Sequence, residues 1–150
     1  ARHPALRFYI VGSNPAPQVL ALARTPDVVV TGRVADVRPY LQHARLAVAP
    51  LRVARGIQNK VLEAMAMGRP IVVSAAALEG ITPQPWMQEI VAEGAEAMVE
   101  RIDRLLTTDR LDSLGALGRQ TMLSHYSWQN SYHLLDSVIE NRAPRSLHGH

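Results

Sequence analysis

The stretch RGIQNKVLEAMAMGRP, residues 55–70, decides the fold because it reads as a loop, a helix and a stop signal in succession. Gly56 opens it, Gly68 and Pro70 close it, and the apolar run Ile71–Ser74 follows. Apolar residues at helical spacing predict a helix over 56–67. Its core-facing side is expected to consist of Ile57, Val61, Leu62 and Met65.

The opposite face of the predicted helix carries polar chemistry. Gly56, Lys60, Glu63 and Met67 recur at i, i+4, i+7 and i+11 and so share this face, where Asn59 stacks on Glu63. Lys60 is the only lysine in the chain. A loop rich in backbone N–H groups that enters a positive helix end binds anions, and a carboxylate further along accepts hydrogen bonds from hydroxyls. The segment therefore indicates a pocket for a sugar nucleotide.

The alternative is that Lys60 and Glu63 form an ordinary exposed pair, which is worth only ~0.2–0.5 kcal/mol. The preceding strand and the Arg55–Gly56 loop favour the ligand site, because they place the basic helix end at a binding rim.

Outward from this segment, short apolar runs alternate with helical patterns, which predicts a doubly wound, Rossmann-like α/β fold: a parallel sheet with helices on both faces and a C-terminal helical run. Strands are expected at Leu6–Val11, Val28–Thr31, Leu46–Pro50, Ile71–Ser74 and Glu89–Ala92. Further helices are expected at Pro17–Arg24, from a cap at Asp36 to about His43 with Pro39 in the first turn, and at Ala95–Leu106, Asp109–His125 and Ser127–Asn141. In the first of these, Val19, Leu20 and Leu22 should point inward, and Asp109 and Ser127 should cap the last two.

Ligands of such sheets bind beyond the carboxyl ends of the strands. The loops at that rim are Gly12–Pro17, Gly32–Asp36, Leu51–Gly56 and Ser74–Gly80. Gly12 and Gly32 belong to no complete glycine-rich phosphate motif and can be plain turn glycines. A backbone without Cβ can also approach a ring or a phosphate closely. Ser74–Gly80 reads equally well as a connection or as a contact.

Composition bounds the function. The chain has 150 residues, 47% of them hydrophobic, which suits one domain with a real core. It has no cysteine, which excludes disulfides and fits a reducing compartment. No apolar run approaches the ~18 residues that cross a bilayer.

Charge is uneven, with nine basic and two acidic residues in 1–60 and seven basic against eleven acidic residues in 61–150. This balance indicates an anionic ligand at the first half, or simply an arginine-rich composition with solvated faces. Nucleic acid is disfavoured, because the arginines are scattered and few aromatics accompany them.

Other catalytic chemistries find no support in the residue pattern. The six histidines lack ligand spacing and no carboxylate cluster offers an octahedral site, so neither a metal nor another cofactor is expected. No Ser-His-Asp order or G-x-S-x-G elbow is present. Tyr126 and Trp128 are expected to be packing anchors rather than ligand stackers.

From about Leu6 to Trp128 the chain resembles the C-terminal, donor-binding domain of retaining glycosyltransferases of family 4 (group 1), which have the two-domain B fold. It is most similar to bacterial members associated with exopolysaccharide synthesis. The run over 56–74 is specific, and the other pieces are weak singly but arrive in the right order. The matching pieces are LRFYIVGSNP (6–15), VVVTGRVADVRPYL (28–41), ARLAVAPL (44–51), GIQNKVLEAMAMGRPIVVS (56–74) and HYSW (125–128).

The resemblance implies a role for each part of the motif. Glu63 would hold the ribose hydroxyls of a nucleotide-sugar donor, the loop Gly32, Arg33 and Val34 would meet the base, and Gly12 would be a rim glycine. Transfer in the family is metal-independent, with protein dipoles and basic groups stabilising the departing diphosphate; no single catalytic residue is assigned. The diphosphate and the sugar would lie against Arg55, Gly56, Ile57, Gln58, Asn59 and Lys60.

Two departures from the family pattern limit this transfer of roles. The family often has a Glu facing the donor sugar eight residues before the position of Glu63, and here that position is Arg55. The family's first strand, with an Arg and a Lys that clamp the diphosphate, and its acceptor-binding N-terminal domain would precede Ala1. Residues 1–142 are thus expected to be a nucleotide-sugar-binding domain, with 143–150 as a disordered tail.

The parent enzyme is then expected to be a cytoplasmic hexosyltransferase, acting on a glycan or lipid-linked acceptor and associated peripherally with the inner membrane face. The isolated chain should bind donor weakly and turn over little. One alternative is a non-enzymatic nucleotide-sensing or protein-interaction module of the same fold. Another is a nucleotide-sugar epimerase, which should carry an acid/base pair on the rim, and no convincing pair is found there.

Overall fold

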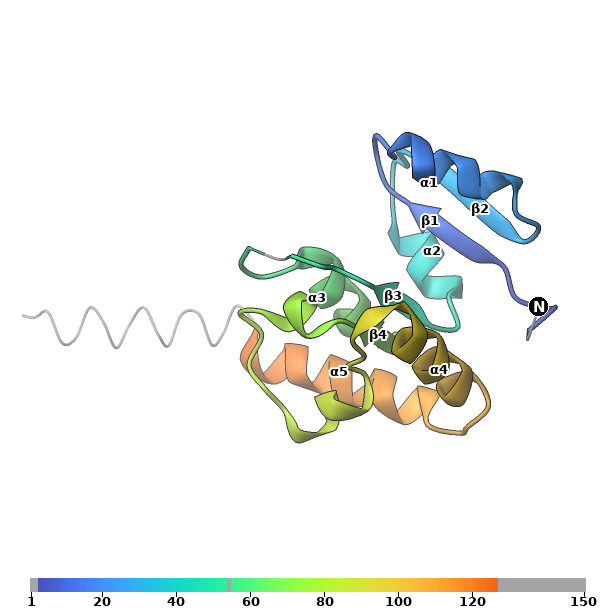
Figure 1. Ribbon diagram of the computed structural model, residues 1–150. Helices are drawn as coiled ribbons and strands as arrows, with labels where there is room; N and C mark the ends of the chain where they lie inside the picture. The colour runs from blue at the N-terminus through green and yellow to red at the C-terminus, as the bar shows by residue number, and fades with distance from the viewer. Residues whose placement is uncertain (1–2, 54, 127–150) are drawn as a thin grey trace, which may run out of the picture. The chain divides into compact units, whose positions relative to one another are not determined.

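The computed structural model describes residues 3–53 and 55–126. These residues form four short strands, five α-helices and three 3-10 helices (Figure 1). The strands pair in parallel, so the predicted α/β, Rossmann-like fold class is confirmed. In chain order the elements are β1 (Phe8–Val11), α1 (Pro17–Ala21), η1 (Leu22–Arg24), β2 (Val28–Gly32), α2 (Arg38–His43), β3 (Ala47–Ala49), α3 (Asn59–Ala66), β4 (Ile71–Val73), η2 (Ala75–Leu78), η3 (Pro85–Glu89), α4 (Gly94–Leu106) and α5 (Leu111–His125).

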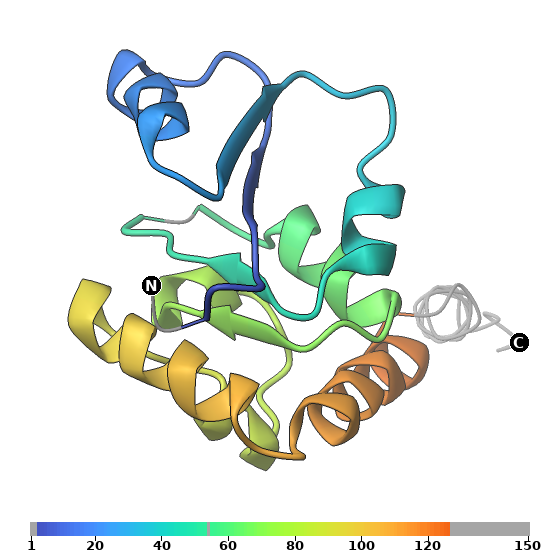
Figure 2. The same cartoon turned by 90° about the vertical axis from the view of Figure 1, so that its right-hand side faces the viewer.

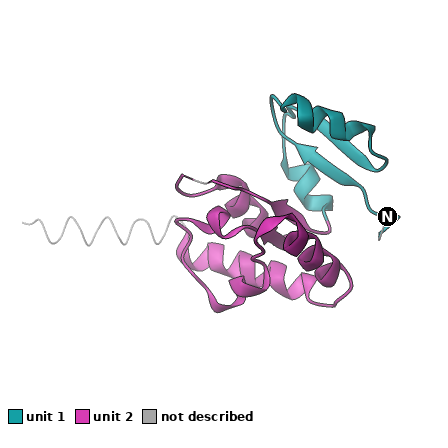
Figure 3. Ribbon diagram, viewed as in Figure 1, with its two compact units in different colours: residues 1–44 teal, residues 45–150 magenta. Residues whose placement is uncertain are grey.

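The chain divides into two compact units, residues 1–44 (unit 1) and 45–150 (unit 2) (Figure 3). No helix in the described ranges is long and apolar enough to cross a membrane. The expected helix over 127–141, Trp128, and the tail over 143–150 lie outside the described residues.

In unit 1, β1 and β2 run parallel, with Phe8 opposite Val28 and a shift in register at the end of β1. The expectation that Leu20 and Leu22 face inward is wrong, because these side chains are 52% and 45% exposed. The reason is geometric: α1 has only five residues, so its inner face holds one apolar side chain, the partly buried Val19. The chain then tightens into η1, whose spacing differs from that of an α-helix.

Asp36 fixes the start of α2, but it does not occupy the cap position that was predicted for it. Asp36 Oδ1 accepts the backbone N–H of Arg38 at 2.9 Å, and the guanidinium of Arg38 donates to both carboxylate oxygens at 2.9 and 3.0 Å. The helix itself is capped by Val37, which makes no side-chain cap bond. Asp36 therefore acts one residue before the cap, and Pro39 lies in the first turn as predicted.

In unit 2, β3 and β4 also run parallel, with Val48 opposite Val72, and every residue of β4 is buried. The predicted strand over 89–92 is wrong: only Val91 forms a bridge, to Val73. It is held by bonds from Val73 N to Ile90 O (3.0 Å) and from Ala92 N to Val73 O (2.9 Å). The 3-10 turn η3 continues to Glu89 and leaves too few residues for a strand.

The core of unit 2 lies where α3 meets β4 and α5, while α4 packs on β4. Both α4 and α5 lie below the β3–β4 pair in the two views (Figures 1 and 2). Glycines on α5 permit a close approach to α3. A Cβ at Gly115 would overlap the carbonyl oxygen of Gly68, and one at Gly118 would lie 3.3 Å from Met65 Cγ.

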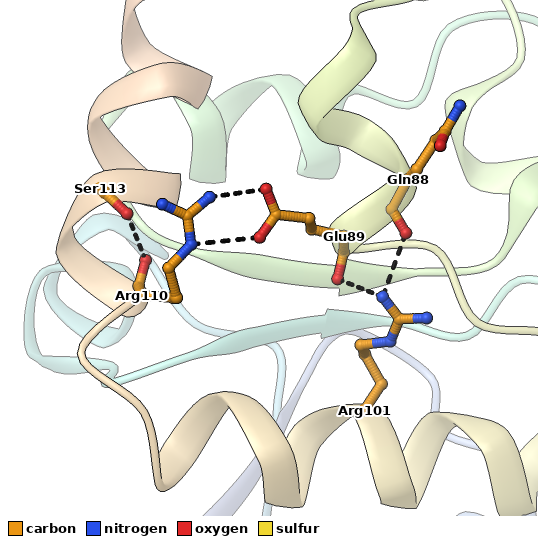
Figure 4. Close-up of polar contacts among 5 residues, drawn as sticks. All are labelled: Gln88, Glu89, Arg101, Arg110 and Ser113. Carbon is orange, nitrogen blue, oxygen red and sulfur yellow. Dashed lines mark hydrogen bonds and ion pairs between the residues drawn. The ribbon is translucent and has the colours of Figure 1, made fainter.

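Two arginines hold η3 in place (Figure 4). Arg110 binds the carboxylate of Glu89 with two bonds, at 2.6 and 3.1 Å, and Arg101 Nη1 donates to the carbonyls of Gln88 (3.1 Å) and Glu89 (2.6 Å). The predicted Asp109 cap is wrong. Arg110 is the cap residue of α5, its side chain engaged with Glu89 and its carbonyl accepting the Ser113 hydroxyl at 2.9 Å.

Candidate functional site

The loop between β3 and α3 starts from a fixed point. Leu51 N–H bonds back to the carbonyl of Ala49 at 3.0 Å, which turns the chain sharply after β3. Ser74, at the end of β4, donates its hydroxyl to the carbonyl of Leu51 at 2.6 Å and its N–H to Ala49 O at 3.2 Å. Because Ser74 is buried, this rim residue is a structural tie between the carboxyl ends of the two strands.

The helix predicted over 56–67 is α3, and it begins at Asn59, three residues later than predicted. Gly56 has φ +73°, a left-handed conformation that does not belong to a helix, and Gln58 Nε2 donates to the Gly56 carbonyl at 3.0 Å within the loop. Placing Ile57 on the core side is consequently wrong, because this side chain lies in the loop and is 46% exposed.

The other three residues predicted to face the core are buried or partly buried. Val61 and Met65 are fully buried, as predicted, together with Ala64. Leu62 is partly buried.

The first turn of α3 presents polar groups outward. The carbonyl of Gln58 accepts the N–H groups of Val61 (2.9 Å) and Leu62 (3.2 Å). In the described ranges the N–H groups of Asn59 and Lys60 make no hydrogen bond, and Gln58 supplies no side-chain cap. The partial positive charge of the helix end is therefore open to an anion.

Asn59, Lys60 and Glu63 are all exposed and lie at helical spacing, so they share the outer face of α3. Within the part of the chain that the structure describes, no ion pair joins Lys60 to Glu63. The alternative reading, an ordinary salt-bridged pair, is therefore not formed, and both side chains are exposed.

The predicted site residues of unit 1 lie at the ends of its two strands. Gly12 N–H donates to the carbonyl of Gly32 at 3.2 Å, so the two rim glycines are neighbours. A Cβ at either position would meet nothing within 4 Å, and Gly32 has φ +67°. The following Arg33 is exposed and Val34 is partly buried. The structure thus brings Gly12 and Gly32 together within unit 1, and the predicted residues 55–60 and 63 together within unit 2.

Residues 1–108 match the protein family described as Glycosyl transferases group 1. The chain belongs to this family. The matched range contains the whole loop and helix over 55–66 and both rim glycines. Comparison with curated proteins gives no match. Membership supports glycosyl transfer in general, and with it the binding of a nucleotide-sugar donor and an acceptor.

Within the described ranges, this glycosyltransferase domain has no group of three or more His, Asp or Glu side chains arranged to hold a metal ion. Family membership supports glycosyl transfer as the general class of reaction.

Three further residues shape the glycosyltransferase rim, and sequence reasoning missed one of them, Glu93, while it named Gly80 only as the end of a rim loop and Tyr126 only as a packing anchor. Glu93 accepts the N–H of Ala75 at 2.5 Å and so holds the start of η2. The Tyr126 hydroxyl donates to the carbonyl of Gly80 at 3.3 Å. Gly80 has φ +77°, and a glycine that ends a rim segment was the one sequence signal for it. Glu93 gave no signal, because its partner is 18 positions away.

Proposed function

We propose that the chain is the donor-binding domain of a retaining group 1 glycosyltransferase. The parent enzyme transfers a hexose from a nucleoside-diphosphate sugar to a glycan or lipid-linked acceptor in bacterial exopolysaccharide synthesis. The observation that supports this proposal is the exposed outer face of α3, where, among residues 3–53 and 55–126, the N–H groups of Asn59 and Lys60 make no hydrogen bond and the side chains of Lys60 and Glu63 form no ion pair.

In this proposal the donor's diphosphate lies at the start of α3. The N–H groups of Asn59 and Lys60 and the Lys60 ammonium supply hydrogen bonds and positive charge, and Arg55 and the Gly56–Gln58 backbone line the approach of the sugar. Glu63, one turn further, accepts hydrogen bonds from the ribose hydroxyls. By the family resemblance, we propose Gly32, Arg33 and Val34, which belong to unit 1, for the base, and Gly12 as a rim glycine.

The chemistry that these groups supply is electrostatic. As the bond between the sugar and the diphosphate breaks, negative charge grows on the departing phosphate oxygens. In this proposal the positive helix end and the Lys60 ammonium stabilise that charge. We propose that these groups act without a metal ion, because the helix end and Lys60 supply the positive charge.

The acceptor is proposed to bind outside residues 1–142, which together form the donor-binding domain. A lipid-linked acceptor would hold the parent enzyme at the cytoplasmic face of the membrane as a peripheral protein. These finer assignments follow from the resemblance of the central motif to exopolysaccharide-associated transferases.

Calorimetric titration with UDP, GDP and their sugars tests the proposal. Glu63→Ala removes charge-assisted hydrogen bonds worth about 1.5–3 kcal/mol, so the dissociation constant should rise about ten- to hundredfold. Glu100→Ala is the matched control, because Glu100 is an exposed helical glutamate on α4. Binding that does not respond to Glu63→Ala, or that responds equally to both variants, would contradict the proposed ribose site.

A further inference from the structure

We propose that Tyr126 is a positioning residue for the donor loop, defined here as residues 55–60. This inference rests on the proposed function of that loop. Tyr126 does not belong to the loop and is not assigned to donor contact. It acts through Gly80, which lies between them in a chain of contacts inside unit 2.

The hydroxyl of Tyr126 makes two hydrogen bonds to one segment. It accepts the backbone N–H of Thr82 at 3.0 Å and donates to the carbonyl of Gly80 at 3.3 Å. The backbone of Tyr126 is itself fixed, because its N–H bonds to the carbonyl of Met122 at 2.9 Å at the end of α5. One phenol oxygen therefore ties the 80–82 segment to the last turn of a packed helix.

Gly80 in turn lies directly against the donor loop. A Cβ built on Gly80 would be 2.8 Å from Ile57 Cγ1 and 3.5 Å from Ile57 N. A Cβ at this position would therefore force the Ile57 side chain to shift, and the positive φ of Gly80 independently favours glycine. The position of the Gly80 backbone thus sets where Ile57, two residues before α3, can lie.

The donor loop has few contacts of other kinds to hold it. Arg55, Gly56 and Ile57 are exposed, and Val53 just before them is 76% exposed. A loop with so little buried apolar surface takes its conformation from the few contacts it does make. A second bond near the same helix end, between Gln84 Nε2 and His125 Nε2 at 3.3 Å, holds the 80–84 segment on the side of α5.

Removing the Tyr126 hydroxyl should therefore loosen the loop without disturbing the core. In Tyr126→Phe the ring remains, while the Thr82 N–H and the Gly80 carbonyl turn to water. The start of the donor loop then samples more conformations, and a ligand must select the competent one, which weakens its apparent affinity. The effect should fall on diphosphate binding, because the loop meets the diphosphate and not the nucleoside.

The binding experiment compares nucleosides with nucleoside diphosphates. In Tyr126→Phe the affinity for UDP or GDP and their sugars should fall about three- to tenfold, while the affinity for uridine or guanosine, which relies on Glu63, stays unchanged. Tyr40→Phe is the matched control: this tyrosine pairs with Tyr9 in unit 1, with ring centroids 6.0 Å apart. Equal diphosphate affinity in Tyr126→Phe and wild type would overturn the inference, as would a parallel loss of nucleoside affinity.

A measurement on the ligand-free protein separates this inference from the proposed function. The NMR signal of the Ile57 δ1 methyl group should shift in Tyr126→Phe and in Gly80→Ala, and should not move in Tyr40→Phe. If wild type binds no nucleotide, the proposed function fails, and the Ile57 signal alone decides whether Tyr126 positions the loop. An unmoved Ile57 signal in Tyr126→Phe overturns it, and the shift expected in Gly80→Ala shows that the signal responds to a change at Gly80.

Discussion

Asp36 shows how a single side chain can serve a helix without occupying its cap. Its carboxylate accepts hydrogen bonds from both the guanidinium and the backbone N–H of Arg38. The guanidinium bonds make the largest contribution, and the backbone bond the next, to lowering the pKa of Asp36 below its ordinary value of 3.8. The charge of Asp36 is thereby favoured in the folded chain. Both partners are solvent-exposed, so the pair orders the start of α2 more than it stabilises the fold.

A pH-dependent prediction follows for this pair. A carboxyl group whose folded pKa is lowered stabilises the fold above its ordinary pKa, and this contribution is lost as the pH falls below about 3.8 through the folded pKa. Arg38→Ala should raise the pKa of Asp36 back toward its ordinary value, as measured by NMR titration of the side-chain carboxyl carbon. Arg24→Ala, at another exposed arginine of unit 1, should leave that titration unchanged. A pKa that does not rise in Arg38→Ala would contradict the assignment of its cause.

At the scale of elements, two glycines of α5 allow this helix to pack closely against α3 and the residues that follow α3. Gly115 lies where a Cβ would overlap a backbone carbonyl oxygen, that of Gly68, which cannot move aside cheaply. Gly118 faces the side chain of Met65, which can adjust. Two glycines on one helix thus carry different structural demands.

Substitution of each glycine by alanine separates these demands. Gly115→Ala should lower the free energy of unfolding by about 1–3 kcal/mol, because two elements must separate to admit the methyl group. Gly118→Ala should change it little, since the better helix propensity of alanine, worth about 0.5–1 kcal/mol, offsets the displacement of Met65. Urea denaturation followed by circular dichroism measures both. Equal losses in the two variants would show that the backbone contact is not the cause.

Sequence predicted the elements well where local chemistry alone forms them. β-branched runs at 28–31 and 71–74 became β2 and β4, and the polar face with Asn59, Lys60 and Glu63 came directly from helical spacing. It failed where a local conformation interrupts a pattern. Because Gly56 has a positive φ, α3 begins later than predicted, and the 3-10 turn η3 includes Glu89, the first residue of the expected fifth strand.

At the scale of the whole molecule, the fold class and the family could be predicted. Strand and helix patterns alternate along the sequence, and the run over 56–74 is specific to the family. The family match over residues 1–108 agrees with that prediction. The ties that shape the rim could not be predicted. Tyr126 reaches Gly80 across 46 positions and Glu93 reaches Ala75 across 18, and no spacing rule relates residues so far apart.

The uneven bonding along α3 has a consequence for how the domain opens. Among the described residues the amides of Asn59 and Lys60 have no acceptor, whereas Ala64 and Met65 are buried and Met65 lies against Gly118 of α5. The amide hydrogens of the first turn of α3 should therefore exchange rapidly with solvent. Those of its last turn should exchange only through cooperative unfolding of unit 2.

Addition of a nucleoside diphosphate should slow exchange at the first turn alone, as hydrogen-exchange NMR with and without UDP or GDP can measure. Uniform protection along α3 before ligand is added would rule this out. If the gradient holds, the end of the helix that meets the donor can rearrange without cost to the end that holds the domain together.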